Sequence, residues 1–271
     1  MPDAELALAA VSAGAAVVRA TYGASLTRLL KTPDVDGPPD FATEADVEAE
    51  RAITSLIRTA RPGDGVLGEE QGLTGPAEAA RTWLVDPLCG TLNFAARTPL
   101  VAVNVALRVG DEVSAAAVAD PLAGEAWWTD GEAAWVRRLD DPGSDRPAVP
   151  DATSGLVDVN LDAPYPNGRS FRAVRLLGED GFAARFRPRV LSTTLALAWV
   201  ADGRRAAYLT DGDLRDSVHF AAGIALCQAA GCVVTGLRGQ PLHTGVGGLV
   251  VAADGDSHAA LVGLVERQFA G

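Results

Sequence analysis

Between residues 101 and 136 short apolar segments alternate with turn residues, and this pattern constrains the fold more than any other part of the sequence. Four segments are separated by Gly110-Asp111, Asp120–Gly124 and Asp130-Gly131, all of which favour tight turns. Strands joined by such turns pair with their neighbours in sequence. We therefore predict an antiparallel meander, with strands at Val101–Arg108, Glu112–Ala119, Glu125–Thr129 and Ala133–Val136.

The residues ahead of this meander predict two helices and two further strands. Apolar residues recur with helical spacing over Asp3–Ala20 and Glu44–Ala60, and residues 31–39 between them are a cluster of turn formers. Short apolar runs at Val66-Leu67 and Trp83–Val85 predict two strands. The first half of the chain therefore combines helices and strands as an α+β unit.

A polar, proline-rich stretch at residues 138–154 marks the predicted boundary between the two halves. Beyond it strands and helices are predicted to alternate, which is typical of α/β proteins. The predicted strands are Gly155–Asn160, Arg189–Leu191, Ala206–Leu209, Cys232–Thr235 and Gly248–Ala253, and the predicted helices are Ser170–Leu177, Thr193–Ala201, Ser217–Ala230 and Ser257–Phe269. We predict one α+β half over residues 1–145 and one α/β half over residues 146–271.

Composition narrows the choice of partners and compartment. The 271 residues include 23 Lys and Arg and 35 Asp and Glu, a net charge of −12, which argues against general affinity for nucleic acid or anionic membranes. Small phosphorylated ligands remain compatible with a local positive spot. Three cysteines are too few for a disulfide framework and indicate a reducing compartment. With no signal-like start and no run of ~18 apolar residues, we expect a soluble cytoplasmic protein.

Three acidic residues lie where predicted strands give way to the next segment: Asp46, Glu69 and Asp86. Carboxylates at neighbouring strand ends can converge on one divalent cation, and Mg²⁺ prefers oxygen ligands. Gly90-Thr91 follows Asp86 and opens a predicted helix, which would direct backbone N–H groups at an anion.

Each of these motifs also has a purely structural interpretation. Asp46 lies three residues after Thr43, the spacing of a capping box that starts a helix. Glu69-Glu70 is typical of a solvated turn, and Asp86-Pro87 is itself a turn signal. No single motif therefore establishes a metal site.

Their order, however, resembles the inositol monophosphatase-like family of metal-dependent sugar phosphatases. Members of that family carry a D-x-x-T-x-x-D-like segment, a G-E-E, and a W-x-x-D-P-I-D-G-T-x-N-F. The corresponding segments here are Asp40–Asp46, Gly68–Glu70 and Trp83–Phe94. The resemblance covers nearly the whole chain and implies a layered αβαβα sandwich, Mg²⁺-dependent phosphomonoester hydrolysis without a covalent phosphoenzyme, and a homodimer.

The resemblance also implies a role for each matching residue. Glu69 and Asp86, with the carbonyl of Leu88, would bind the first metal, Mg²⁺ by default and Mn²⁺ or Zn²⁺ as alternatives. Gly90 and Thr91 would hold phosphate through their backbone amides. Glu69, Thr91 and Asp46 would orient the attacking water. The substrate would be a phosphorylated or otherwise anionic small molecule of sugar or inositol type.

Two departures from the family pattern fall on the chemistry. Cys89 and His219 stand where the family has aspartates that serve the second metal. Replacing two hard anionic ligands by a thiol and an imidazole should weaken Mg²⁺ at that position. Asp216 could stand in as a carboxylate, although its place favours a helix cap instead.

Three explanations of this altered site compete. In the first, hydrolysis has been lost and the fold serves as a non-catalytic binding module. In the second, the site binds Zn²⁺, which accepts sulfur and nitrogen, through Asp86, Cys89 and His219. In the third, the pocket performs a different reaction of specialised metabolism, in which Cys89, near a helix N-terminus, acts through a lowered thiol pKa. Two plainer roles stand beside them, with Cys89 filling space and His219 lying in the first turn of a helix. We take phosphomonoester hydrolysis as the default and a diverged member without it as the alternative.

Overall fold

The computed structural model describes the whole chain except residues 25–27, 31–40, 77, 213 and 271, so the predicted loop at 31–39 and Asp40 of the first motif lie outside the described residues. The chain forms two compact units. The first comprises Met1–Pro147 with two short later segments, Thr193–Leu195 and Asp216–Leu226, and the second comprises the remainder.

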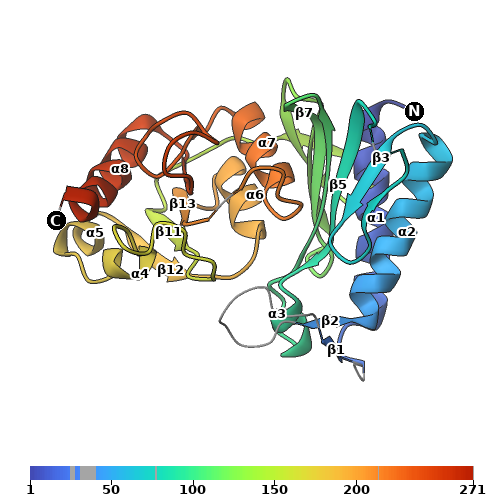
Figure 1. Ribbon diagram of the computed structural model, residues 1–271, viewed down its shortest axis with the longest axis horizontal. Coiled ribbons are helices and arrows are strands. Elements are labelled where there is room, and N and C mark those ends of the chain that lie inside the picture. Colours follow the sequence, from blue (N-terminus) through green and yellow to red (C-terminus); the bar gives the residue numbers. More distant parts are fainter. Residues whose placement is uncertain (25–27, 31–40, 77, 213, 271) are drawn as a thin grey trace. The chain divides into compact units, whose positions relative to one another are not determined.

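The first unit is built on an eight-stranded sheet, shown in Figure 1. Every neighbouring pair in it is antiparallel except β3 and β5, which run parallel. In sheet order the strands are β10 (Asp141–Pro147), β9 (Ala134–Arg138), β8 (Glu125–Thr129), β7 (Glu112–Asp120), β6 (Ala102–Val109), β5 (Arg81–Cys89), β3 (Gly65–Gly68) and β4 (Gly72–Thr74).

Two long helices, α1 (Asp3–Thr21) and α2 (Glu44–Ala60), lie side by side against this sheet (Figure 1). Both carry apolar residues at helical spacing, and those residues form one core with the inner side chains of β5, β6 and β7. The helices approach closely at Gly14, where an added Cβ would lie 2.7 Å from Cδ1 of Ile53. A side chain at that crossing would therefore require Ile53 to shift.

Shorter elements complete the first unit and lead into the site. β1 (Arg28–Leu30) pairs antiparallel with β2 (Phe41–Thr43), and β2 runs directly into α2. The five-residue helix α3 (Thr91–Ala95) follows β5 after a single residue, Gly90. The chain thus changes from strand to helix at two places that hold motif residues, Thr43 and Gly90.

The second unit contains a five-stranded sheet. In sheet order its strands are β12 (Arg187–Val190), β11 (Leu156–Val159), β13 (Ala207–Thr210), β15 (Leu249–Ala252) and β14 (Val233–Thr235). The first three strands are parallel to one another, and β15 is antiparallel to both of its neighbours. The later helices are α4 (Ala173–Leu176), α5 (Asp180–Arg185), α6 (Leu195–Ala201), α7 (Ala221–Ala230) and α8 (Gly255–Ala270). Side chains of α4, α5 and α8 pack with the sheet into a second core.

The meander predicted over residues 101–136 is confirmed, because β6 to β9 pair in sequence order and antiparallel. The strands β1, β2 and β4 and the helix α5 were not predicted, and two other details differ from the predictions. The polar stretch at 138–154 contains a strand, β10, which lies at the edge of the sheet and is mostly exposed, so it needs no apolar pattern. Helix α7 begins at Ala221 and not at Ser217, which leaves His219 in the turn ahead of it. The assignment of roles to residues 1–145 and 146–271 stays a prediction.

Helix α1 is long and apolar enough, by length and composition alone, to cross a membrane. Its apolar residues, however, belong to the core shared with α2 and the sheet. A buried core helix meets the same criteria, so this feature carries little weight for a membrane location.

Candidate metal and phosphate site

Glu69 and Asp86 lie next to each other because β3 and β5 are parallel neighbours in register. Gly68 pairs with Val85, and each acid is the next residue in its own strand direction. The N–H of Glu69 also donates to the carbonyl of Val85 over 3.1 Å. The sequence predicted that Asp86 ends its strand, but β5 continues to Cys89 with an irregular register after Asp86. Sheet pairing therefore places Glu69 and Asp86 side by side.

Asp86 is fully buried, and its carboxylate is surrounded by hydrogen-bond donors. Oδ1 accepts from the N–H of Leu88 over 3.1 Å, and Oδ2 accepts from Nδ2 of Asn104 over 3.2 Å. Sequence reasoning missed Asn104, although a lone amide in the apolar run Val101–Leu107 is a usable signal, because buried polar groups almost always have a partner. Asn104 also donates to the hydroxyl of Thr194 over 2.9 Å.

His219 joins the two acids from the turn before α7. Its Nδ1 lies 2.8 Å from Oδ2 of Asp86 and 4.0 Å from Oε2 of Glu69. One ligand atom from each of Glu69, Asp86 and His219 lies within 4.8 Å of the other two. Two carboxylates and an imidazole make a donor set that fits a divalent cation, and the nitrogen suits Zn²⁺ or Mn²⁺ at least as well as Mg²⁺.

Cys89 has a different environment from the one predicted. Its Sγ accepts a hydrogen bond from the N–H of Thr194 over 3.4 Å. Within the described part of the chain, the metal-compatible group comprises Glu69, Asp86 and His219 without Cys89. Burial raises the pKa of the Cys89 thiol well above its ordinary value, and the Asp86 and Glu69 carboxylates raise it further. This direction is opposite to the lowered thiol pKa that the third explanation assumed.

Asp46 serves the helix start and the site together. Its Oδ2 accepts from the backbone N–H of Thr43 over 2.8 Å and from the Thr43 hydroxyl over 2.5 Å, so the predicted capping box is confirmed. Its Oδ1 accepts from the hydroxyl of Thr91 over 2.9 Å. Burial raises the pKa of Asp46, while the hydrogen bonds from Thr43 and Thr91 act against that shift.

The predicted anion-binding segment begins at Gly90. This residue is the N-cap of α3 and has a φ of 93°, in the left-handed region that favours glycine. The first N–H groups of a helix have no acceptor within it, so those that follow Gly90 are available to an anion. The Thr91 hydroxyl, besides its bond to Asp46, lies 3.2 Å from the carbonyl oxygen of Leu88.

Asp216 plays neither of the roles considered for it. It has a φ of 58° and forms an ion pair with Arg108. Because α7 begins five residues later, at Ala221, Asp216 does not cap that helix. It is also absent from the metal-compatible group found among the described residues.

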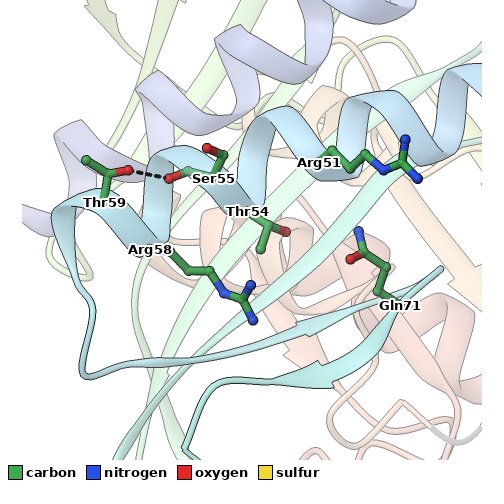
Figure 2. A pocket seen from close by; sticks show the side chains of 6 residues that line it. All are labelled: Arg51, Thr54, Ser55, Arg58, Thr59 and Gln71. Atoms are coloured by element: carbon green, nitrogen blue, oxygen red, sulfur yellow. Dashed lines mark hydrogen bonds between the residues drawn. The ribbon is translucent and has the colours of Figure 1, made fainter.

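A cavity of about 470 Å³ lies along α2, and none of the site residues described above lines it. Figure 2 shows its lining side chains, which come from α2 and the turn between β3 and β4: Arg51, Thr54, Ser55, Arg58, Thr59 and Gln71. No carboxylate is among them, so this cavity lacks the ligands of a cation site. It does, however, border the turn that carries Glu69, because Gln71 lies two residues further along.

Two carboxylates on neighbouring strands, beside a helix that begins at a glycine, are features of an α/β protein of the metal-dependent phosphatase class. Residues 2–269 match the inositol monophosphatase family, and the chain belongs to that family.

Relatives and solved structures agree with this assignment. The chain is 30% identical over 234 residues to an inositol-1-monophosphatase of Caulobacter vibrioides, covering 83% of this chain and 87% of the relative. It is 32% identical over 243 residues to an inositol-1-monophosphatase of Mycobacterium leprae, covering 85% and 79%. The crystal structure of extragenic suppressor protein suhB from Bartonella henselae has a similar fold, with a TM-score of 0.81 at 23% identity over 96% of this chain and 97% of that one.

These matches confirm the family and the mixed α/β fold class expected from the sequence resemblance. The family is one of metal-dependent phosphatases that act on phosphorylated small molecules, and membership supports that class for this chain. The role of each site residue stays a prediction.

Proposed function

We propose that the protein is a divalent-cation-dependent phosphomonoesterase acting on a phosphorylated small molecule of sugar or inositol type. The observation that carries this proposal is the meeting of the Glu69 and Asp86 carboxylates with His219, with one ligand atom from each within 4.8 Å of the others. The names of the relatives, inositol-1-monophosphatases, support inositol phosphates as the first substrates to test.

In this proposal Glu69 and Asp86, with the carbonyl of Leu88, hold the cation, and His219 is an additional nitrogen donor. A bound divalent cation supplies screening of the phosphate charge and lowers the pKa of a coordinated water. Mg²⁺ is the family's expected cation, with Mn²⁺ and Zn²⁺ as alternatives suited to the imidazole.

The remaining residues bind and orient. The backbone N–H groups of Gly90 and Thr91 bind the phosphate oxygens of the substrate. Asp46 accepts the hydrogen bond of the Thr91 hydroxyl over 2.9 Å, so the lone pairs of the hydroxyl oxygen can accept a hydrogen bond from the attacking water. Glu69 holds the other side of that water. No side chain attacks phosphorus, and positioning contributes the larger part of what the protein itself does.

A second candidate is a member of the family that binds a phosphorylated ligand without hydrolysing it, or that performs a different reaction. The contact between His219 Nδ1 and Asp86 Oδ2, at 2.8 Å, favours it, because the imidazole occupies an oxygen that a cation would use. Under either candidate we also propose a cytoplasmic homodimer, as family resemblance and composition predict. Light scattering on the purified protein tests the dimer.

Release of inorganic phosphate distinguishes the two candidates. The wild-type protein is assayed against inositol 1-phosphate and a panel of sugar phosphates with Mg²⁺, Mn²⁺ or Zn²⁺, beside Glu69→Gln and Asp86→Asn. The first candidate predicts cation-dependent phosphate release in the wild type that both variants lose. Wild-type activity no higher than that of Asp86→Asn under all three cations would overturn it in favour of the second.

A further inference from the structure

We propose that Glu50, a residue of α2 outside the motifs, is a positioning residue that fixes the turn carrying Glu69 and so sets the geometry of the acidic pair. This inference rests on the proposed function, since it concerns a residue of the proposed cation site.

The Glu50 side chain is fully buried, yet it has no cationic partner among the described residues. Its two oxygens bind consecutive backbone N–H groups instead. Oε2 accepts from Glu70 over 2.8 Å and Oε1 accepts from Gln71 over 2.9 Å. Hydrogen bonds to a carboxylate are stronger than neutral ones. Both amides directly follow Glu69, so the carboxylate holds the backbone immediately after the proposed ligand.

The end of β3 is shaped to receive this carboxylate. A Cβ added to Gly68 would lie 2.5 to 2.6 Å from the carboxylate atoms of Glu50, so a residue with a side chain does not fit there without a shift. Burying a carboxylate is costly unless every oxygen is hydrogen-bonded, and an apolar side chain would fill the same space more cheaply. The charge at position 50 therefore has a use beyond packing.

Helix α2 connects this contact to the other half of the site. Asp46 and Glu50 are four residues apart, so they lie on the same face of α2, about 6 Å apart along its axis. Asp46 accepts from the Thr91 hydroxyl, and Glu50 accepts from the turn after Glu69. One rigid helix thereby fixes the two groups proposed to orient the attacking water.

The same turn also has an exposed side. Gln71 is exposed and lines the cavity of about 470 Å³, across which Figure 2 shows Thr54 and Arg58. On the side that faces α2, Glu50 accepts two hydrogen bonds from this turn. These bonds can determine the direction of the Glu69 side chain.

The test compares Glu50→Gln with Glu48→Gln, which removes the same charge from an exposed position on the same helix. In Glu50→Gln the amide NH₂ faces a backbone N–H, so one of the two hydrogen bonds is lost. In the metal-free protein we expect hydrogen exchange at the amides of Glu70 and Gln71 to increase about 10-fold or more. Calorimetry should show Mn²⁺ affinity weakened about 10-fold or more, the usual effect of losing a partner that orients a ligand. Glu48→Gln should leave both unchanged.

The outcomes separate this inference from the proposed function. Unchanged exchange at both amides in Glu50→Gln would overturn the role of Glu50, whatever the protein binds. Faster exchange in Glu50→Gln with a wild-type protein that fails to bind Mn²⁺ would support the hold on the turn and overturn the proposed cation site. If Glu50→Gln does not fold, Glu50→Asp, which keeps the charge but is one methylene shorter, replaces it, with the same readings expected. A lower melting temperature together with wild-type Mn²⁺ affinity would show that Glu50 is structural only.

Discussion

Asp46→Asn should separate the folding role of Asp46 from its catalytic role. The two carboxylate oxygens have different partners. Oδ2 accepts hydrogen bonds from the backbone N–H and the hydroxyl of Thr43, and Oδ1 accepts one from the hydroxyl of Thr91. Asparagine offers one oxygen and one NH₂ group. The backbone N–H of Thr43 has a fixed direction and needs an acceptor. The side-chain oxygen of the new asparagine must therefore face Thr43, and its NH₂ group must face Thr91.

The magnitudes follow from this division. A weakened cap costs about 1 kcal/mol, and removing a buried charge whose pKa is raised by burial offsets part of that loss. We therefore expect the melting temperature to fall by about 2–4 °C. The Thr91 hydroxyl, facing a donor in place of an acceptor, is left to donate to the Leu88 carbonyl 3.2 Å away and loses its orientation. We expect kcat to fall about 100-fold, which corresponds to about 2.7 kcal/mol of barrier.

Thermal melting and steady-state phosphate release are measured on three variants and one double variant. Thr43→Ala weakens the same cap without touching Thr91, so it should match Asp46→Asn in melting temperature and keep kcat within about threefold of the wild type. Thr91→Ala should lower kcat as Asp46→Asn does. Since the two residues act as a unit, Asp46→Asn with Thr91→Ala should be no slower than the slower single variant.

Two results would refute the reasoning. If Asp46→Asn melts like Thr43→Ala and turns over like the wild type, Asp46 is a helix cap and nothing more. If Thr43→Ala loses as much rate as Asp46→Asn, the effect travels through the start of α2 and not through the Thr91 hydroxyl.

Three further predictions concern the acidic pair, the altered positions and the second unit. Glu69→Gln and Asp86→Asn should each weaken Mn²⁺ binding about 10-fold or more in a calorimetric titration, and unchanged affinity in both would exclude the cation site. Cys89→Asp combined with His219→Asp should restore hard ligands and raise Mg²⁺-dependent hydrolysis by more than the two single changes combined, whereas a fall in activity would mean that the thiol and imidazole have a task of their own. Burial raises the pKa of Asp158 from 3.8 to about 6 despite its ion pair with Arg205, so the native state keeps a proton that the unfolded chain has lost. This group contributes about 3 kcal/mol to the free energy of unfolding below about pH 3.8, and the contribution is lost as the pH rises through about 6. Urea unfolding at pH 4 and pH 7 should show that Asp158→Asn removes this pH dependence. An equal change in the free energy of unfolding between the two pH values in both proteins would contradict the prediction.

Local chemistry explains what the sequence could predict. The strands β6 to β9 follow from turn residues placed between short apolar segments, and each pairing requires only the next segment along the chain. The capping box follows from a spacing of three residues between Thr43 and Asp46. Edge strand β10 was missed because its residues are mostly exposed, so neither an apolar run nor an alternating pattern marks it.

Contacts that depend on distant pairing could not be predicted. Glu69 and Asp86 were expected near each other, but their separation depends on the parallel register of β3 and β5, which no local pattern encodes. His219 meets Asp86 across 133 positions in sequence, and only the family resemblance pointed to it. Glu50 resembles any acidic residue on a charged helix until the β3 turn is placed against it.

The histidine at position 219 also changes what Asp86 needs. A carboxylate only accepts hydrogen bonds, so before a cation binds, Nδ1 of His219 carries the proton that spans the 2.8 Å to Oδ2, and a cation held by Nδ1 would have to displace that proton. An aspartate there, as in the family pattern, would place a second anion near a fully buried carboxylate and require a cation to offset the repulsion. With histidine, Asp86 has donors in Leu88, Asn104 and His219 before any cation binds. The site can therefore keep its arrangement without metal, and a cation that uses Oδ2 must compete with the imidazole for it.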